Sequence, residues 1–404
     1  MVKKLLGEKI KIAIYDGVIP SSIFIENLIG SLSKKEVKIY LFGRSLNKCF
    51  YYSHNVKIFS YPKNKILSLG FIFIQILYML FMHPRRLKKI YFHYKSISKK
   101  EKIHFINWWR KILPVVNNLP DIFHIQWAKA LPKWFFLKDL FNVKLVLSLR
   151  GAHINYSPLA DIEIKDTYKQ LFPHVDIFHA VSDAIRFEAQ RYGALDSKIK
   201  TVYSGIDLPA LNNFRKTNWS IQKTFHFLSV GRYHWKKGYQ YALIAIKELL
   251  NENFDVHYTI IAKNEPSEEV LYQIHDLSIK DSITLTSSKT QKGVYKKMSE
   301  SDCLLLPSVE EGVANVILEA MALGVPVISS NCGGMTEVID DGSNGLIFNK
   351  RDTSNLANVM KNFIKMHEDQ KKEMVKKARK QIEKKHDYDA LGNKMYQLYK
   401  SIEL

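Results

Sequence analysis

The segment Pro307–Gly334 constrains the fold more strongly than any other part of the chain. The apolar run Cys303–Ser308 that leads into it is typical of a parallel strand buried on both faces. Gly324 and Pro326 end the helix that is predicted to follow, and the apolar run Val325–Ser329 predicts the next strand. This order of strand, turn, helix and strand is the building unit of an open α/β sheet.

Two carboxylates lie in this unit, Glu311 at the strand-to-helix turn and Glu319 inside the helix. Open α/β sheets bind ligands at this end of their strands. A carboxylate accepts hydrogen bonds from hydroxyl groups, which cover most of a sugar. Gly312 lets a ligand approach the backbone, and a helix N-terminus offers free N–H groups to a phosphate. The pattern predicts a site for a sugar and its phosphate. The alternative is two surface glutamates on an ordinary βαβ unit.

A second group of charged residues follows the predicted strand Phe225–Val230. Arg232 lies beside Gly231 at the end of this strand, and Lys237 precedes a predicted helix. Two cations near a common point would stabilise the charge on a departing diphosphate. The spacing fits neither a Walker loop nor a GxGxxG fingerprint, and ordinary surface cations near a turn are the alternative.

Predicted strands and helices alternate in two halves of the chain, which indicates two similar α/β domains with mostly parallel sheets, facing each other across a cleft. The predicted domains are residues 1–205 and 224–385, with a linker at 206–223 and a C-terminal helix in 386–404. We leave open whether that helix packs back on the first domain. In the first half, strands are predicted at Ile10–Tyr15, Val37–Phe42, Ile122–Gln126, Lys144–Leu149, Ile177–Ala180 and Lys200–Tyr203, and a helix near Ile23–Ser33. In the second half, further strands are predicted at Val256–Ile261 and Ile283–Leu285, and helices at Tyr239–Asn251, Asp369–Lys385 and Ala390–Ile402.

The net charge of +21 is concentrated in the first hundred residues, which hold 19 Lys and Arg against 4 Asp and Glu. A basic excess at one end suggests an anionic partner, and nucleic acid and an anionic membrane leaflet are both candidates. A solvated, Lys-rich surface is the alternative. The densest cluster comprises Arg85, Arg86, Lys88, Lys89, Lys95, Lys99, Lys100 and Lys102.

An apolar stretch, Ile66–Met82, precedes this basic cluster and ends at Pro84. It is slightly shorter than the ~20 residues that a membrane-spanning helix needs. A buried core helix is the favoured interpretation, and a helix lying in the membrane interface is the alternative. The three cysteines, Cys49, Cys303 and Cys332, have no metal-ligand spacing, and the start of the chain does not resemble a signal peptide. Both observations predict a cytoplasmic protein.

Together, the two charged segments resemble those of the retaining glycosyltransferases of family 4. The resemblance rests on Gly231-Arg232 with Lys237-Gly238, Glu311-Gly312, Leu318-Glu319-Ala320-Met321-Ala322 and Gly324-Val325-Pro326-Val327. Supporting matches are Val181-Ser182, Tyr203-Ser204-Gly205-Ile206-Asp207, Gly333-Gly334 with Glu337, and Asp341-Gly342 with Asn344-Gly345. The fold of this family is GT-B, an α/β architecture of two Rossmann-like parallel-sheet domains facing a central cleft.

The resemblance implies a role for each charged residue. Arg232 and Lys237 would bind the diphosphate of a nucleotide-sugar donor and stabilise it as it leaves. Glu311 would hold hydroxyls of the donor sugar, and Glu319 would hold the ribose hydroxyls. The donor site would be completed by Gly231, Gly312, Val313, Ala314 and Asn315. The implied reaction is hexosyl transfer with retention of the anomeric configuration.

This chain departs from the family pattern at several positions. Where members commonly carry His-Gly at the end of a first-domain strand, it has Arg150-Gly151, followed by Ala152-His153. Arg150 is the favoured replacement, and His153 remains a candidate. His124 is either a buried histidine satisfied by the backbone or a functional residue. In the predicted loop Asp16–Ser22, Gly17 stands where many members have two glycines. The sequence Ala262-Lys263-Asn264 replaces a glycine-rich turn near the nucleotide, which leaves the base undefined.

Neither a metal nor a cofactor other than the nucleotide-sugar co-substrate is expected. Asp387-Tyr388-Asp389 has a metal-like spacing but is predicted to cap the last helix. The expected acceptor is a glycan, favoured as lipid-linked, at the anionic inner face of the cell membrane. Capsule, exopolysaccharide and lipopolysaccharide assembly all use such acceptors. The alternatives are a GT-B sugar-nucleotide epimerase and a basic nucleic-acid-binding protein without enzyme activity, whereas the favoured function involves no nucleic acid.

Overall fold

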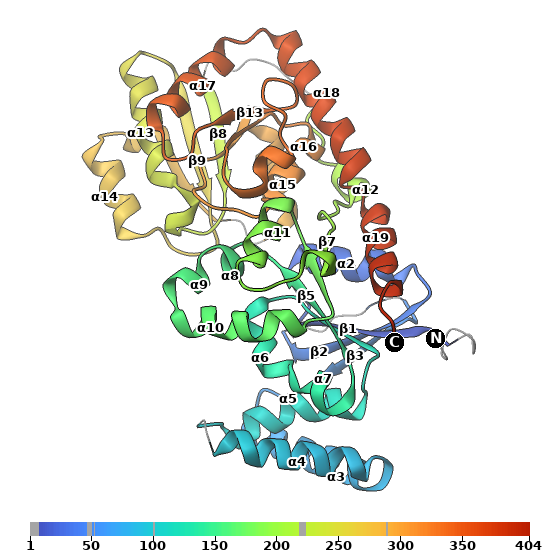
Figure 1. The fold of residues 1–404 in the computed structure, drawn as a ribbon. Coiled ribbons are helices and arrows are strands. Elements are labelled where there is room, and N and C mark those ends of the chain that lie inside the picture. The colour runs from blue at the N-terminus through green and yellow to red at the C-terminus, as the bar shows by residue number, and fades with distance from the viewer. Residues whose placement is uncertain (1–7, 47–50, 52, 100–101, 218–223, 288–289) are drawn as a thin grey trace. The chain divides into compact units, whose positions relative to one another are not determined.

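The computed structural model describes residues 8–46, 51, 53–99, 102–217, 224–287 and 290–404 (Figure 1). Cys49, Lys100 and part of the predicted linker, 218–223, lie outside the described residues. The chain divides into two compact units. The first comprises Met1–Ala180, Ala189–Val202 and Leu391–Leu404, and the second comprises Val181–Glu188 and Tyr203–Ala390.

The first unit is built on a seven-stranded parallel sheet with the strand order β3-β2-β1-β4-β5-β6-β7. Its strands are β1 (Ile10–Ile19), β2 (Val37–Ser45), β3 (Val56–Ser60), β4 (Ile122–Ile125), β5 (Lys144–Leu149), β6 (Ile177–Ala180) and β7 (Ile199–Thr201). Its helices are α2 (Ile23–Ser33), α3 (Lys65–Met82), α4 (Pro84–Ser98), α5 (Phe105–Asn117), α6 (Leu131–Trp134), α7 (Phe136–Phe141), α8 (Ala152–Asn155), α9 (Ser157–Ala160) and α10 (Ile162–Leu171). The end of the last helix, α19 (Tyr388–Lys400), packs into the core of this unit through Met395 and Tyr399.

The second unit contains a six-stranded parallel sheet with the order β10-β9-β8-β11-β12-β13. Its strands are β8 (Phe225–Val230), β9 (Val256–Ile261), β10 (Ile283–Thr286), β11 (Cys303–Leu306), β12 (Val327–Ser330) and β13 (Leu346–Phe348). Its helices are α12 (Leu208–Asn212), α13 (Tyr239–Asn251), α14 (Glu268–Asp276), α15 (Gln291–Glu300), α16 (Asn315–Leu323), α17 (Thr353–Lys365) and α18 (Glu368–Lys385). Helix α11 (Asp183–Gln190) contributes residues to both units.

The core of the second unit lies on both faces of its sheet. Successive side chains of a strand point to opposite faces, and β11 shows the consequence. Cys303 and Leu305 belong to one buried cluster, whereas Leu304 and Leu306 belong to another. All four are buried, which explains why the strand reads as a continuous apolar run.

The predicted α/β architecture is confirmed, because both units are Rossmann-like, each with a parallel sheet whose strands alternate with helices. The domain boundaries differ from the prediction in detail. Val181–Glu188 group with the second unit, and only residues from Leu391 onward group with the first. The predicted loop Asp16–Ser22 is wrong in its first part, because β1 continues to Ile19 after a register shift at Gly17, whose φ is +90°.

The interpretation of Ile66–Met82 as a buried core helix is also wrong. The stretch forms α3, which is long and apolar enough to cross a membrane, with a mean hydropathy of 2.0. Only 17% of it is buried, because a single stripe of Ser68, Ile72 and Met79 faces the rest of the unit. The remaining surface of the helix carries apolar side chains exposed to solvent.

Candidate functional site

The structure brings the two charged segments of the second unit together at the ends of β8 and β11. Gly238 adopts φ +65°, and a Cβ atom there would lie 2.0 Å from the carbonyl oxygen of Pro307. The backbone N–H of Val309 donates to the carbonyl oxygen of Lys236 over 2.7 Å. The loop after β8 therefore rests directly on the loop after β11, and this close approach requires glycine at position 238.

Lys237 and Glu311 form an ion pair across these two loops. Lys237 Nζ lies 2.7 Å from Glu311 Oε1, and Lys236 Nζ lies 3.6 Å from Glu311 Oε2. Ser308 Oγ donates to Glu311 Oε1 over 3.2 Å. Burial alone would raise the pKa of Glu311, but the two lysines outweigh it and lower this pKa below its ordinary value. Glu311 is thus a buried, charged acceptor, held beside two cations.

Arg232 stands apart from this ion pair. It is exposed, and within the described part of the chain its side chain forms no hydrogen bond or ion pair. The neighbouring Tyr233 is instead fixed by Asn264, which accepts from the Tyr233 N–H over 3.0 Å and donates to the Tyr233 carbonyl over 3.2 Å. The residues that replace the expected glycine-rich turn therefore fix the backbone beside Arg232.

Helix α16 begins beside Glu311 without a capping side chain. Its N-cap residue is Ala314, so the first N–H groups of the helix are available to an anion. The turn before it packs against the backbone of Gly333 and Gly334. Gly334 N–H donates to the carbonyl oxygen of Gly312 over 2.7 Å. The Oδ1 atom of Asn315 is buried without a hydrogen-bond partner among the described residues.

Glu319 occupies a different environment on the same helix. Its Oε1 accepts from Gln291 Nε2 over 3.1 Å and from Tyr295 OH over 3.3 Å, and both donors belong to α15. The side chain is buried and no cation pairs with it in the described part of the chain. Burial therefore raises the pKa of Glu319 to about 7, which the hydrogen bond from Tyr295 only partly offsets.

This raised pKa predicts that the stability of the fold depends on pH. At a pH below the unfolded pKa, Glu319 is protonated in both states and its burial costs no ionisation energy. As the pH rises through 7, the free energy of unfolding falls, because the unfolded state ionises more readily than the folded state. Glu319→Gln should therefore increase the free energy of unfolding at pH 8 by up to about 3 kcal/mol. At pH 4 it should have little effect. Urea unfolding at both pH values measures the difference.

Glu269→Gln, at an exposed position in α14, is the matched control and should leave the pH dependence unchanged. An equal response of the two variants would contradict the assignment of the raised pKa to Glu319.

Glu337, one of the supporting matches, holds the start of α11. Its two carboxylate oxygens accept from the backbone N–H groups of Asp183 and Ala184, each over 2.9 Å. Tyr203 OH also donates to Glu337, over 3.0 Å. A carboxylate at a helix N-terminus satisfies free N–H groups and interacts favourably with the helix dipole. Glu337 is therefore a positioning residue, and its contacts explain why Val181–Glu188 group with the second unit.

In the first unit, Arg150 follows β5 and lies in a polar and aromatic group. Its guanidinium donates to Gln126 Oε1 over 3.0 Å and stacks on Phe24, with 4.5 Å from Cζ to the ring centre. Burial lowers the pKa of Arg150 to about 10. Its Nε has no hydrogen-bond partner among the described residues. His153 lies against Trp127, with ring centres 5.0 Å apart. Arg150 and His153 thus both remain candidates in this group.

His124 belongs to the core of the first unit. Its Nδ1 lies 2.7 Å from Tyr399 OH and its Nε2 lies 2.8 Å from Ser148 Oγ. Ser148 Oγ also lies 2.9 Å from His179 Nδ1. Burial lowers the pKa of His124 well below its ordinary value and that of His179 to about 3, so both rings are neutral. These contacts favour the buried alternative for His124, with side chains rather than backbone as its partners.

Several contacts in these groups have no counterpart in the sequence analysis. Asp16 accepts a hydrogen bond from Trp127 Nε1 in the first unit. In the second unit, Lys236, Ser308, Gln291 and Tyr295 bind the two glutamates. Lys236 and Ser308 lie close in sequence to Lys237 and Glu311, whereas Gln291 and Tyr295 reach Glu319 from another helix, α15. The sequence therefore carries a local signal for the first two residues and none for the other two. Asp387, by contrast, accepts from Ala390 N–H over 2.9 Å, as expected of a helix cap.

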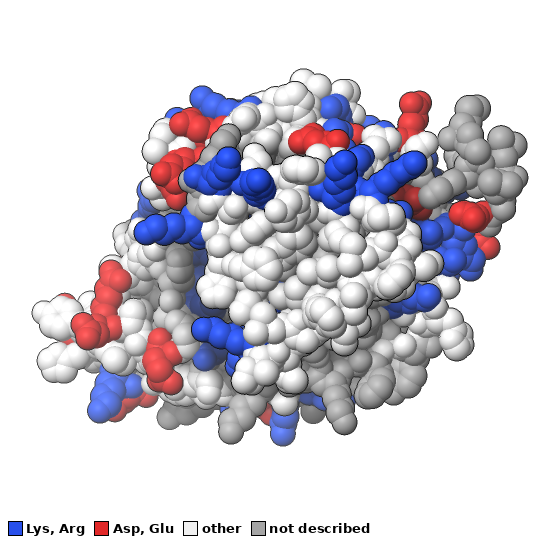
Figure 2. All heavy atoms as spheres, turned by 90° about the horizontal axis from the view of Figure 1, so that it is seen from below, with Lys and Arg blue, Asp and Glu red and all other residues white. Residues whose placement is uncertain are grey.

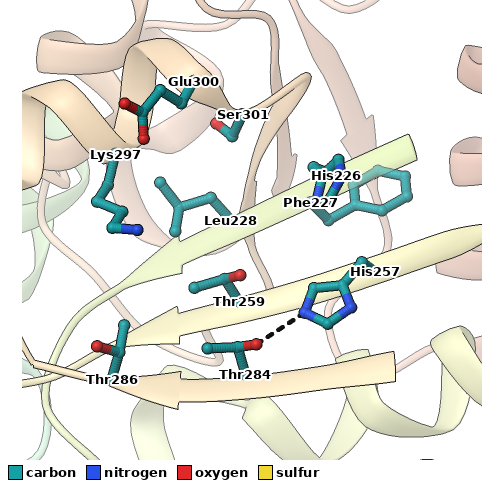
Figure 3. Close-up of a pocket in the computed structure, with 10 residues that line it drawn as sticks. All are labelled: His226, Phe227, Leu228, His257, Thr259, Thr284, Thr286, Lys297, Glu300 and Ser301. Atoms are coloured by element: carbon teal, nitrogen blue, oxygen red, sulfur yellow. Dashed lines mark hydrogen bonds between the residues drawn. The ribbon is translucent and has the colours of Figure 1, made fainter. Parts of the chain in front are cut away.

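A cavity of about 440 Å³ lies elsewhere in the second unit, over one face of the sheet (Figure 3). Side chains two positions apart on β8, β9 and β10 line it together with α15, because alternate residues of a strand share a face. His257 Nε2 lies 2.8 Å from Thr284 Oγ1 within it. None of the predicted site residues lines this cavity, which is on the sheet face rather than at the strand ends.

Residues 212–381 match the family model described as Glycosyl transferases group 1. Among relatives, an amylovoran biosynthesis glycosyltransferase, AmsK from Erwinia amylovora, is 28% identical over 59% of this chain. WcaL from Escherichia coli, a glycosyltransferase assigned provisionally to colanic acid biosynthesis, is 27% identical over 55% of the chain. The matched stretches span 60% of the length of AmsK and 55% of the length of WcaL.

Solved structures resemble the whole chain more fully than these sequences do. The crystal structure of HepE from Anabaena in complex with UDP superposes with a TM-score of 0.68 at 18% identity. The superposition covers 98% of this chain and 100% of that one. The likeness establishes the fold of both units. The chain thus has the GT-B fold, and residues 212–381, within its second unit, are similar to the glycosyl transferases group 1 family.

Proposed function

We propose that the protein is a glycosyltransferase that moves a sugar from a nucleotide-diphosphate sugar to a glycan acceptor. The observation that carries this proposal is the ion pair between the partly buried Lys237 and the buried Glu311, which lies at two strand ends beside the uncapped N-terminus of α16. A cation and free N–H groups suit a diphosphate, and a charged carboxylate suits the hydroxyls of a sugar. Open α/β sheets bind ligands at this edge.

The donor would be held almost entirely by the second unit. Lys237 and Arg232 would contact the diphosphate, Glu311 the sugar, and Glu319 the ribose. The backbone from Gly231 and from Gly312 to Asn315 would complete the site. HepE, whose structures contain UDP and UDP-glucose, supports a uridine nucleotide as the first donor to test. The Gln291 and Tyr295 contacts orient Glu319 and leave its second oxygen available to a ribose hydroxyl.

We further propose transfer of a hexose with retention of configuration. The acceptor oxygen would bond to the anomeric carbon on the face from which the diphosphate leaves. The bond between that carbon and the phosphate oxygen would break, and the acceptor proton would pass to the leaving phosphate. Lys237 and the N-terminus of α16 would stabilise the charge that develops on the diphosphate. Because these groups supply the positive charge, no metal is assigned to the reaction.

The acceptor is proposed to be a lipid-linked glycan of a bacterial surface polysaccharide, with the enzyme on the cytoplasmic face of the membrane. The names of AmsK and WcaL refer to amylovoran and colanic acid, which supports an acceptor in polysaccharide synthesis. Arg150, His153 and Gly17 of the first unit are proposed to contribute to acceptor and donor-sugar contacts. The basic excess of the first hundred residues suits an anionic lipid diphosphate.

A panel of nucleotide sugars tests the donor proposal directly. A bound donor stabilises the folded protein by mass action, so the correct donor should raise the melting temperature. At a hundredfold excess over Kd, the free energy of unfolding should increase by about 2.7 kcal/mol. UDP-glucose, GDP-mannose and UDP alone are suitable first probes. The anomeric configuration of the product, read by NMR coupling constants, then tests retention.

The alternatives give different results in the same assays. An epimerase would convert a nucleotide sugar without an acceptor, and no glycosidic bond would form. A nucleic-acid-binding protein would shift DNA in a salt-dependent manner and respond to no nucleotide sugar. Either result would contradict the proposed transfer.

A further inference from the structure

Helix α3 exposes an almost continuous apolar surface. Phe81 is 83% exposed, Ile66 78% and Ile74 64%, which are unusual values for large apolar side chains on one helix. Ten exposed large hydrophobic residues lie within its 18 positions. They are Ile66, Leu67, Leu69, Phe73, Ile74, Leu77, Tyr78, Leu80, Phe81 and Met82.

Two polar side chains in the body of α3, Ser68 and Gln75, lie on its opposite, inner side. Ser68 is buried and donates to the carbonyl oxygen of Asn64 over 2.7 Å. Gln75 Oε1 accepts from Asn117 Nδ2 of α5 over 2.5 Å. A helix on a water-exposed surface shows the reverse arrangement, with polar residues outward and apolar residues inward. The outer side of α3 is therefore suited to an apolar medium.

The surroundings of this apolar face are basic. The sequence contains no Asp or Glu from residue 37 to residue 100. On α4, Arg85, Lys88 and Lys95 are exposed at helical spacing, with the exposed Phe92 between them. Figure 2 shows a broad face without charged side chains, with Lys and Arg side chains around its margin. An apolar centre with a basic margin matches the acyl chains and anionic headgroups of a lipid bilayer.

We propose that α3 and α4 form a membrane-docking face that binds a bilayer containing anionic lipids. A second copy of this chain is a poorer occupant, because a symmetric contact would bring the same basic margin against itself. Nucleic acid would neutralise the lysines and arginines but would leave the apolar side chains of α3 in water. An anionic bilayer satisfies both parts of the surface at once.

The contacts of α3 indicate that the helix lies in the plane of the interface. Ser68, Ile72 and Met79 face the unit along its length, and Arg110 of α5 donates to Ser68 Oγ over 3.3 Å. Crossing the bilayer would remove these contacts and carry Gln75 into hydrocarbon without its partner. Lying flat, the helix would insert its outer side by roughly 5–10 Å, to the boundary of headgroups and acyl chains.

Vesicle flotation with the full-length chain tests this face. We expect binding to phosphatidylcholine vesicles that contain about one third phosphatidylglycerol, and much weaker binding to phosphatidylcholine alone. Phe73→Ser combined with Ile74→Ser should weaken binding at least about 10-fold, because two inserted side chains are removed. Arg85→Gln combined with Lys88→Gln should weaken it by about 10-fold or more, and only for the anionic vesicles.

Matched controls lie on the second unit. Leu271→Ser with Tyr272→Ser removes two adjacent apolar residues that are 49% and 69% exposed on α14. Lys377→Gln with Lys380→Gln removes two exposed lysines at the same spacing on α18. Both control pairs should bind vesicles as the unmodified protein does. Equal loss in the test and control pairs, or no binding to either vesicle, would overturn the proposal.

The oligomeric state and the depth of insertion give independent readouts. If the face joined two copies instead, sedimentation would show a dimer that Phe73→Ser with Ile74→Ser dissociates, without any vesicle binding. For depth, Ile74→Trp and Phe81→Trp report quenching by lipids brominated along the acyl chain. An in-plane helix places both near the headgroups, whereas quenching of position 74 at the bilayer centre would overturn the flat orientation. None of these assays needs sugar transfer, so this inference and the proposed function can fail separately.

Discussion

Lys237→Ala is expected to reduce turnover at saturating donor by about 100-fold or more. The Lys237 ammonium is the nearest cation to Glu311, at 2.7 Å, and it lies beside the uncapped start of α16. Its charge should matter most when negative charge develops on the leaving diphosphate, so kcat should fall more than KM rises. Steady-state kinetics over a range of donor concentrations separates the two.

The variant also tests the electrostatics of Glu311. Without Lys237, only Lys236, at 3.6 Å, remains to offset the burial of Glu311, and the pKa of that carboxyl should rise. Because a lowered pKa stabilises the fold at high pH and is lost as the pH falls, the variant should lose stability mainly above pH 5. Lys236→Ala is the internal control and should reduce turnover by less than about 10-fold, since it removes the longer contact.

Glu311→Ala should lose turnover by a similar factor, because it removes the acceptor that the ion pair positions. A double variant should then be little worse than either single one, since residues that act as a unit are not additive. Wild-type turnover in Lys237→Ala or Glu311→Ala, with native circular dichroism, would mean that the site lies elsewhere.

The buried strands could be predicted from the sequence because strands in the interior of a parallel sheet are composed mainly of apolar residues. The strands Lys144–Leu149 and Phe225–Val230 were predicted with their observed bounds, since both are short, mainly apolar segments in the interior of a parallel sheet. Strands β3 and β13 were not predicted. The first has a partly exposed edge pattern, and the second has only three residues.

Helix α3 shows where composition fails as a guide. An apolar stretch of this length is most often a core helix, and nothing in its periodicity identifies the face that packs inward. The decisive residues are the polar ones, Ser68 and Gln75, which accept hydrogen bonds from Arg110 and Asn117 of α5 on the inner side of the helix. Such pairings join residues that only the folded chain brings together, so the exposure of Phe73 and Phe81 could not be read from the sequence.

For the candidate site, the sequence predicted the main residues but not their electrostatic environments. Lys237 and Glu311 were selected separately, and the structure pairs them. The different electrostatics of the two glutamates could not be predicted, because they depend on lysines beside Glu311 and on neutral partners from α15 around Glu319. The roles of Arg150 and His153 stay a prediction.

Gly333→Ala is expected to lower the free energy of unfolding of the second unit by at least about 3 kcal/mol. We expect this to be the largest loss from any glycine-to-alanine substitution in the site. A Cβ atom at this position would lie only 1.7 Å from the carbonyl oxygen of Glu311, and the residue adopts φ +52°. The clash cannot be relieved by a side-chain rotation, because the atom it meets belongs to the backbone of the turn that carries Glu311. Turnover should therefore fall together with stability.

Gly342→Ala separates the two causes of this loss. Gly342 has a similar φ of +73°, but no heavy atom lies within 4 Å of a Cβ built there. Its substitution should cost only about 1–2 kcal/mol, the penalty of a left-handed backbone for alanine. Urea unfolding and hydrogen exchange of the amides from Glu311 to Asn315 compare the two variants. If both variants lose the same stability and leave those amides protected, the left-handed backbone conformation alone explains the cost of alanine at position 333. The predicted clash with the carbonyl oxygen of Glu311 would then be wrong.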